Sequence, residues 1–258
     1  MPNSFTVSST TLFGFLMVLA RVAGIFVFVP LPGVKNGPET ARIVLSLGIT
    51  IAFHSLWPSV SGLDRSLAML TGYLLCEAVI GIAIGLALAF LVEAFQMAAQ
   101  ITGLQAGYGY ASTIDPTTQA DSGILLVVAQ TMAGLLFFTM GLDREVLRIF
   151  ALSLQTMPPG QLALSSGVAE TVVRLGSGVF STGLRLALPA VALLGMIDLS
   201  LALLGRLNSQ LQLLTLAFPV KMLVALALLA YLSSIMPRVF GSYAGQVLHV
   251  TRQFAGAR

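Results

Sequence analysis

The chain has 258 residues, of which 57% are hydrophobic and 9% are charged, and its formal net charge is +3. Soluble globular domains carry about 25% charged and about 45–50% apolar residues, so this composition excludes the ordinary soluble class. The sequence contains no run of basic residues of the kind typical of nucleic-acid binding. We therefore expect an all-α integral membrane protein with no nucleic-acid partner.

Apolar stretches of suitable length predict about six helices, including long helical hairpins. A helix needs about 20 apolar residues to cross a hydrocarbon core of about 30 Å. Six stretches approach or exceed this length, and the last two are joined by a short polar link at 205–210. The stretches cover residues 12–31, 43–57, 67–101, 124–142, 179–204 and 211–235.

Local signals mark the ends of several stretches. Pro30 and Pro38 end the first, and Trp57, followed by Pro58, ends the second with a ring suited to a membrane interface. The third is longer than one crossing requires, so we expect part of it to leave the lipid or to lie inside an assembly. A segment rich in Ser and Gly precedes the fifth stretch.

The third and fourth stretches are separated by a segment of different character. It contains Gly103, Gly107 and Gly109, and the dipeptide Asp115-Pro116 follows. Glycine permits backbone conformations that other residues avoid, and the residue before a proline disfavours helix. We therefore expect a loop over residues 103–121 between two very apolar helices.

Six ionisable residues lie inside the apolar stretches. A charge at the centre of a lipid-facing helix costs about 2.5–3.5 kcal/mol on the mildest scales, so these side chains should face protein or water. They could form a polar conduit or a proton relay, or simply pair across helix interfaces, and we favour pairing for each residue taken singly. The six are Arg21, Glu77, Glu93, Arg185, Asp198 and Lys221.

Two glycines predict a close helix contact. Gly81 and Gly85 have the small-residue spacing that lets helix backbones approach each other, and we interpret them as packing residues. Catalytic and metal-binding patterns are weak by comparison. His54 and His249 stand alone, and Cys76 is the single cysteine. We expect no catalytic residues, no cofactor and no metal site.

One motif carries a resemblance to a known family. The segment from Gly103 to Pro116, GLQAGYGYASTIDP, resembles the G-L-Q-x-G-x-x-x-A-x-x-x-D-P signature of the FliR family of the flagellar type III export apparatus. Pro189, the polar link at Arg206 and the sequence Phe218-Pro-Val-Lys221 are also similar to this family. The resemblance covers essentially the whole chain.

This resemblance implies a subunit of a helical hetero-oligomeric export gate in the bacterial inner membrane, at the flagellar basal body. FliP and FliQ would be its partners, FlhB would lie at the base, and unfolded flagellar subunits would pass through the channel. Residues 1–175 would be similar to FliP, and residues 176–258 to a FliQ hairpin with a C-terminal tail. The gating loop would comprise Gly103, Leu104, Gln105, Gly107, Tyr108, Gly109, Tyr110, Ala111, Asp115 and Pro116.

Two other functions remain open from the sequence. The first is the equivalent subunit of a virulence-type injection system. Such subunits share the Asp-Pro pair but usually differ from the G-L-Q-x-G sequence. The second is a proton-coupled secondary transporter, in which Glu77, Glu93 or Asp198 would bind protons near the membrane midplane.

Overall fold

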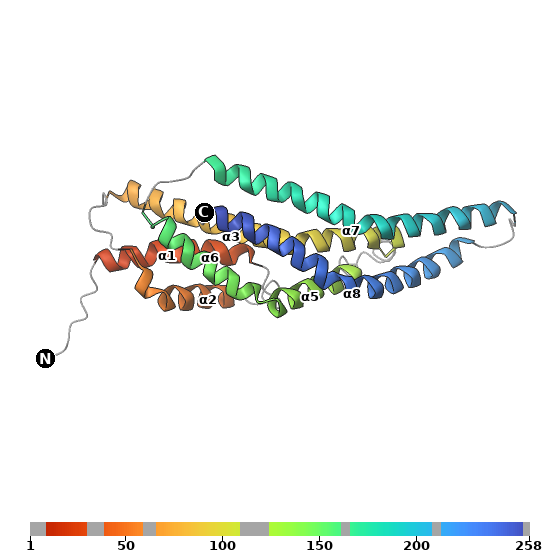
Figure 1. The fold of residues 1–258 in the computed structure, drawn as a ribbon, viewed down its shortest axis with the longest axis horizontal. Helices are drawn as coiled ribbons and strands as arrows, with labels where there is room; N and C mark the ends of the chain where they lie inside the picture. Colours follow the sequence, from red (N-terminus) through yellow and green to blue (C-terminus); the bar gives the residue numbers. More distant parts are fainter. Residues whose placement is uncertain are drawn as a thin grey trace. The chain divides into compact units, whose positions relative to one another are not determined.

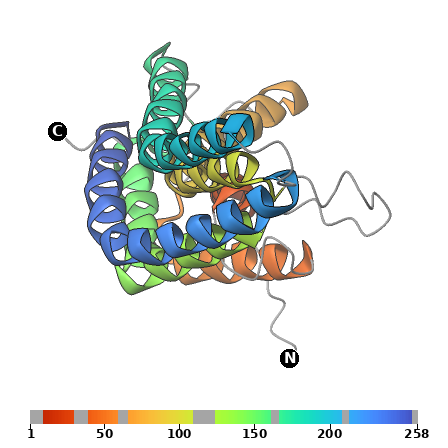
Figure 2. The same ribbon diagram turned by 90° about the vertical axis from the view of Figure 1, so that its right-hand side faces the viewer.

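The computed structural model describes residues 9–29, 39–58, 66–108, 124–160, 166–207 and 213–254. Throughout these ranges the regular elements are helices, and no strand occurs in them, so the prediction of an all-α integral membrane protein is confirmed (Figures 1 and 2). The helices are α1 (Ser9–Phe28), α2 (Glu39–Ala52), a 3₁₀ helix (His54–Leu56), α3 (Leu67–Ala106), α5 (Ile124–Thr139), α6 (Leu142–Thr156), α7 (Ser166–Leu207) and α8 (Leu213–Phe254).

The number of membrane-spanning helices is lower than the expected count of about six. Among the described residues, α1, α3, α7 and α8 are long and apolar enough to cross a membrane, and α5 with α6 would make a fifth span. Helix α2 has 14 residues and is too short. The stretch expected at 124–142 is broken because Gly141 adopts φ +70°, a conformation that glycine tolerates, and α5 and α6 meet at a bend of 64°.

Helices α7 and α8 are longer than their apolar stretches predicted. Helix α7 begins at Ser166 instead of near residue 179, and α8 continues to Phe254 instead of ending near 235. Pro189 lies inside α7, and Pro219 and Pro237 lie inside α8. Both ribbons are continuous past these prolines (Figure 1). Membrane helices tolerate proline because neighbouring groups and local adjustments satisfy the freed backbone carbonyl.

The chain folds into two compact units to which several helices contribute in turn. Unit 1 comprises Met1–Phe90, Phe137–Gly176 and Gly245–Arg258. Unit 2 comprises Leu91–Leu136 and Ser177–Ala244. The boundary between the units falls inside four helices, so that one part of each belongs to unit 1 and the rest to unit 2. These helices are α3, α5, α7 and α8.

Unit 1 is built around a very close approach of α1 to α3. A Cβ atom at Gly81 would lie 2.0 Å from the carbonyl oxygen of Arg21, and one at Gly85 would lie 2.4 Å from that of Ile25. From the other side, a Cβ atom at Gly24 would lie 2.6 Å from the carbonyl oxygen of Ala78. The two backbones are therefore in direct contact, as small residues permit in membrane proteins. Helix α2 packs along α1 (Figure 1).

This contact between helices places a buried ion pair at its edge. The side chains of Arg21 and Glu77 are each only 1% exposed, and Nε of Arg21 donates to Oε2 of Glu77 at 2.6 Å. The second carboxylate oxygen, Oε1, accepts the backbone N–H of Gly160 at 3.1 Å. Both oxygens of the carboxylate are thus satisfied by groups of the same unit.

The remaining donors of Arg21 cap the end of α6. One terminal nitrogen donates to the carbonyl oxygen of Ser153 at 2.7 Å, and the other donates to that of Met157 at 2.9 Å. The last carbonyls of a helix lack partners within the helix and carry partial negative charge, so a cation there is favourable. Arg21 therefore fastens α1, α3 and α6 together.

We predict that Gly81→Ala lowers the stability of the protein purified in detergent by about 1–3 kcal/mol, because the new methyl group has no room beside the backbone of α1. Thermal unfolding in detergent measures the change. Gly48→Ala is the matched control, since a Cβ at this α2 position meets nothing within 4 Å and alanine favours helix. Equal stability of the two variants would contradict the packing role of Gly81.

We also predict that Arg21→Met or Glu77→Leu alone lowers stability by about 3–5 kcal/mol, because each leaves a buried charge without its partner. The double variant Arg21→Met/Glu77→Leu should recover much of this loss, since neither charge remains. The same detergent unfolding measurement reports all three variants. A double variant as unstable as the sum of the single variants would show that the two residues act independently.

Candidate functional site

The end of α3 lies within the segment that was expected to be a loop from Gly103 onward, and that expectation was wrong for its first residues. Helix α3 continues through Gly103, Leu104 and Gln105 to Ala106. The helix ends only at Gly107, which adopts φ +89°. A helical glycine costs only about 1 kcal/mol, so Gly103 does not stop the helix by itself.

Hydrogen bonds define this helix end as a Schellman motif. The N–H of Gly107 donates to the carbonyl oxygen of Leu104 at 3.1 Å, and the N–H of Tyr108 donates to that of Gly103 at 3.0 Å. This pattern requires a left-handed residue at the first position after the helix cap, which is the reason for glycine at 107. Gly109, Tyr110, Ala111, Asp115 and Pro116 lie outside the described residues.

The turn after α3 is held against the first part of α8. A Cβ atom at Gly107 would lie 2.8 Å from Cδ1 of Phe218, so glycine also allows this close approach. The hydroxyl of Tyr108 donates to the carbonyl oxygen of Met222 at 3.2 Å. Burial raises the pKa of the Tyr108 phenol, so the hydroxyl stays protonated and available as a donor near neutral pH.

One residue of α3 reaches an ion pair between α7 and α8. Nζ of Lys221 lies 2.8 Å from Oδ1 and 3.0 Å from Oδ2 of Asp198. Nε2 of Gln105 donates to the same Oδ2 at 3.2 Å. Two of the six ionisable residues therefore pair here, and a residue of the predicted gating segment joins them.

Unit 2 also contains an apolar cluster. Its buried members come from four helices and are Ala106, Leu125, Leu194 and Ala225. Partly buried side chains packed against it include Tyr108, Ile197 and Val224. The start of the segment after α3 is thus fixed by both polar and apolar contacts within unit 2.

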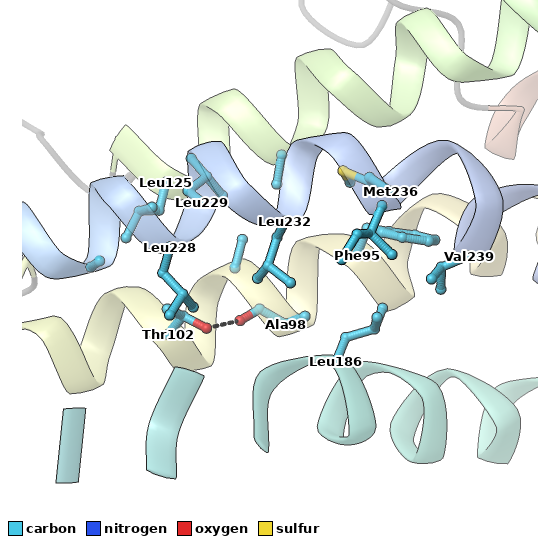
Figure 3. Close-up of a pocket in the computed structure, with 14 residues that line it drawn as sticks. Phe95, Ala98, Thr102, Leu125, Leu186, Leu228, Leu229, Leu232, Met236 and Val239 are labelled. Carbon is cyan, nitrogen blue, oxygen red and sulfur yellow. Dashed lines mark hydrogen bonds between the residues drawn. The ribbon is translucent and has the colours of Figure 1, made fainter. Parts of the chain in front are cut away.

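Unit 2 also contains an apolar cavity of about 80 Å³ (Figure 3). Leu228, Leu232 and Met236 of α8 line it together with Phe95 of α3, and α5 and α7 contribute further apolar side chains. Its one hydroxyl, on Thr102, donates to the carbonyl oxygen of Ala98 at 2.8 Å. The lining carries no charged side chain and its one hydroxyl already donates within α3, so the cavity is suited to apolar contents.

The other predicted residues are not part of this contact. Arg21 and Glu77 form the buried pair of unit 1. Glu93 is half-buried on α3, and Arg185 is exposed on α7. No cluster of three metal-ligating side chains occurs in the described ranges. The sequence analysis missed Ser153, whose carbonyl binds Arg21, and no sequence signal identifies such a backbone acceptor.

Much of the apolar surface of α7 and α8 is left uncovered by the described chain. In the most apolar stretch of each helix, 17% of residues are buried in α7 and 6% in α8. Large exposed side chains of α7 recur at helical spacing and include Phe180, Leu184, Leu188, Met196, Leu199 and Leu203. Lipid or other subunits must cover these faces.

Comparison with known proteins assigns the chain to a family. Residues 12–247 match the family described as bacterial export proteins, family 1. The chain is 30% identical to the flagellar biosynthetic protein FliR of Escherichia coli K12 over 216 residues, 83% of this chain and 82% of that protein. It is 27% identical to the Bacillus subtilis protein of the same name over 230 residues, 86% of each chain. Since the match covers most of its length, the chain belongs to the bacterial export proteins of family 1, as its resemblance to FliR predicted.

Proposed function

We propose that this chain is a non-enzymatic subunit of the flagellar type III export gate, which helps to form and seal the channel for unfolded flagellar subunits. The observation that carries this proposal is the match to an export family over residues 12–247, together with the similarity to flagellar biosynthetic proteins FliR. The four long apolar helices found among the described residues suit a subunit embedded in the bacterial inner membrane.

The segment that follows α3 is the proposed seal. Residues 107–123 connect two very apolar helices and contain only two charged residues, Asp115 and Asp121. Tyr108 and Tyr110 provide bulk, while few charges are present to bind a passing unfolded chain. The contacts of Gly107 and Tyr108 with α8 support this role, because they fix the start of the seal.

The proposed partners are FliP and FliQ, with FlhB at the base of the assembly. The exposed apolar faces of α7 and α8 support partners of this kind, since a helical assembly would cover them. In this proposal residues 1–175 form the FliP-like part, and residues 176–258 form the FliQ-like hairpin and tail.

The pairing of the acids favours this function over a proton-coupled transporter. Both oxygens of Glu77 are occupied by Arg21 and by Gly160. The carboxylate of Asp198 binds Lys221 and Gln105. A proton carrier needs a carboxylate that is free to take up and release protons, whereas both of these carboxylates are occupied by hydrogen-bond and ion-pair partners.

We predict that deleting residues 107–113 leaves assembly largely intact but lets ions and small molecules leak through the membrane, because the bulk of the seal is lost. Ion flux in cells and copurification of partner subunits are the two measurements. Deletion of residues 2–8, which has the same length and ends before α1, is the matched control. Normal secretion with no added leak in the loop deletion would contradict a sealing role.

We further predict that a strain lacking this chain builds no hook or filament and does not swim, because the export channel is incomplete. Electron microscopy of cells and a swimming assay measure this, with plasmid expression of the intact chain as the control. Swimming cells would overturn the flagellar assignment. Loss of injection into host cells with motility retained would instead assign the chain to the virulence-type system.

A further inference from the structure

We propose that a groove between α1 and α2 binds an anionic phospholipid, with one acyl chain along the groove and the phosphate on Arg42. The groove has a volume of about 300 Å³, at the lower end of the range for ligand sites. It lies within unit 1, where α2 packs along α1. We call it the α1–α2 groove, and its lining residues are Leu19, Ala23, Phe26, Val27, Arg42, Ile43, Ser46 and Leu47.

The walls of the α1–α2 groove suit a hydrocarbon chain. All but two of its lining side chains are aliphatic or aromatic. One of these two is Ser46, whose hydroxyl already donates to the carbonyl oxygen of Arg42 at 2.7 Å, within α2. The other is Arg42 itself, which supplies the one charged group of the lining. A ligand that fits this groove combines an apolar body with an anionic group.

Arg42 lies at one end of the α1–α2 groove, where a lipid headgroup would be. The two helices run antiparallel, because the ring of Trp57, just after α2, contacts that of Phe15 near the start of α1, with centroids 5.2 Å apart. The first turn of α2, which contains Arg42, therefore lies beside the last part of α1. Leu19 lines the groove from midway along α1, so an acyl chain would extend from Arg42 toward Leu19.

The charge of Arg42 is the second feature that an anionic lipid would match. Within the described ranges no carboxylate forms an ion pair with Arg42, since the ion pairs there join other residues. A guanidinium group binds phosphate through two parallel hydrogen bonds, and basic pockets between membrane helices bind anionic headgroups. One phospholipid therefore supplies both the missing anion and the apolar body.

The outer surface of α2 favours a surrounding of hydrocarbon. Ser46 and Thr50 are buried, and their hydroxyls donate to carbonyl oxygens of the same helix. Ile43, Val44 and Ile51 are instead at least 59% exposed. A helix at a water surface shows the opposite arrangement, with its apolar side chains turned inward. Since α2 has 14 residues, or about 21 Å, Arg42 at the headgroup level leaves the rest of the helix inside a hydrocarbon core of about 30 Å.

The experiment titrates the full chain, purified in detergent, with phosphatidylglycerol or phosphatidylcholine and counts the bound lipids by native mass spectrometry. We expect one phosphatidylglycerol to bind more tightly than phosphatidylcholine, whose choline cation already neutralises its phosphate. Arg42→Gln should weaken binding of phosphatidylglycerol about tenfold, as expected for the loss of a charge-assisted contact. Arg42→Lys keeps the charge and should retain more of the binding.

A second variant tests the apolar part of the site without changing any charge. Ala23→Leu places a larger side chain in the α1–α2 groove, so it should also weaken binding of phosphatidylglycerol. Two matched controls should leave lipid binding unchanged. Arg144→Gln removes an exposed arginine of α6, and Ala52→Leu makes the same enlargement at an exposed position of α2 outside the lining. Thermal unfolding in lipid-free detergent shows that each variant is folded.

The outcomes bear on this site alone, because the measurement uses the isolated chain and does not depend on export. Equal binding of the two lipids, or unchanged binding of phosphatidylglycerol by Arg42→Gln, would overturn the proposal. Unchanged lipid binding by Ala23→Leu would also overturn it, since the lipid would then lie elsewhere. If Ala23→Leu instead lost copurified partner subunits with its lipid binding intact, the groove would receive a helix of another subunit.

Discussion

Unit 1 depends on the direct contact between the backbones of α1 and α3. Gly24, Gly81 and Gly85 remove the side chains that would keep these helices apart. The same approach brings Arg21 against Glu77, where each charge makes burial of the other possible. Arg21 then donates to two carbonyl oxygens at the end of α6, so the close packing of α1 on α3 also positions the group that binds α6.

Unit 2 also contains an ion pair between helices, but its side chains are less buried than those of Arg21 and Glu77. Its ion pair joins α7 to α8 at a point where one carboxylate remains partly open to the surroundings. The ion pair of unit 1 is fully buried, whereas that of unit 2 is partly exposed in the described chain. The segment proposed to seal the channel starts in unit 2.

The sequence predicted the helices well, because the backbone of a long apolar stretch in lipid must form its hydrogen bonds internally, and a helix does so. It predicted the end of α3 poorly, since Gly103 and Gly107 look alike in sequence but only Gly107 adopts a left-handed conformation. The pairing of Arg21 with Glu77 could not be predicted, because 56 residues separate them and three bases could have met three acids. Gly24 was missed although Ala20 gives it the same small-residue spacing as Gly81 and Gly85.

The uncovered faces of α7 and α8 have a consequence for the life of the chain in the cell. A newly inserted copy exposes leucine, methionine and phenylalanine side chains that lipid or other subunits must cover. We therefore expect its abundance to follow that of its partners, with unassembled copies removed by degradation.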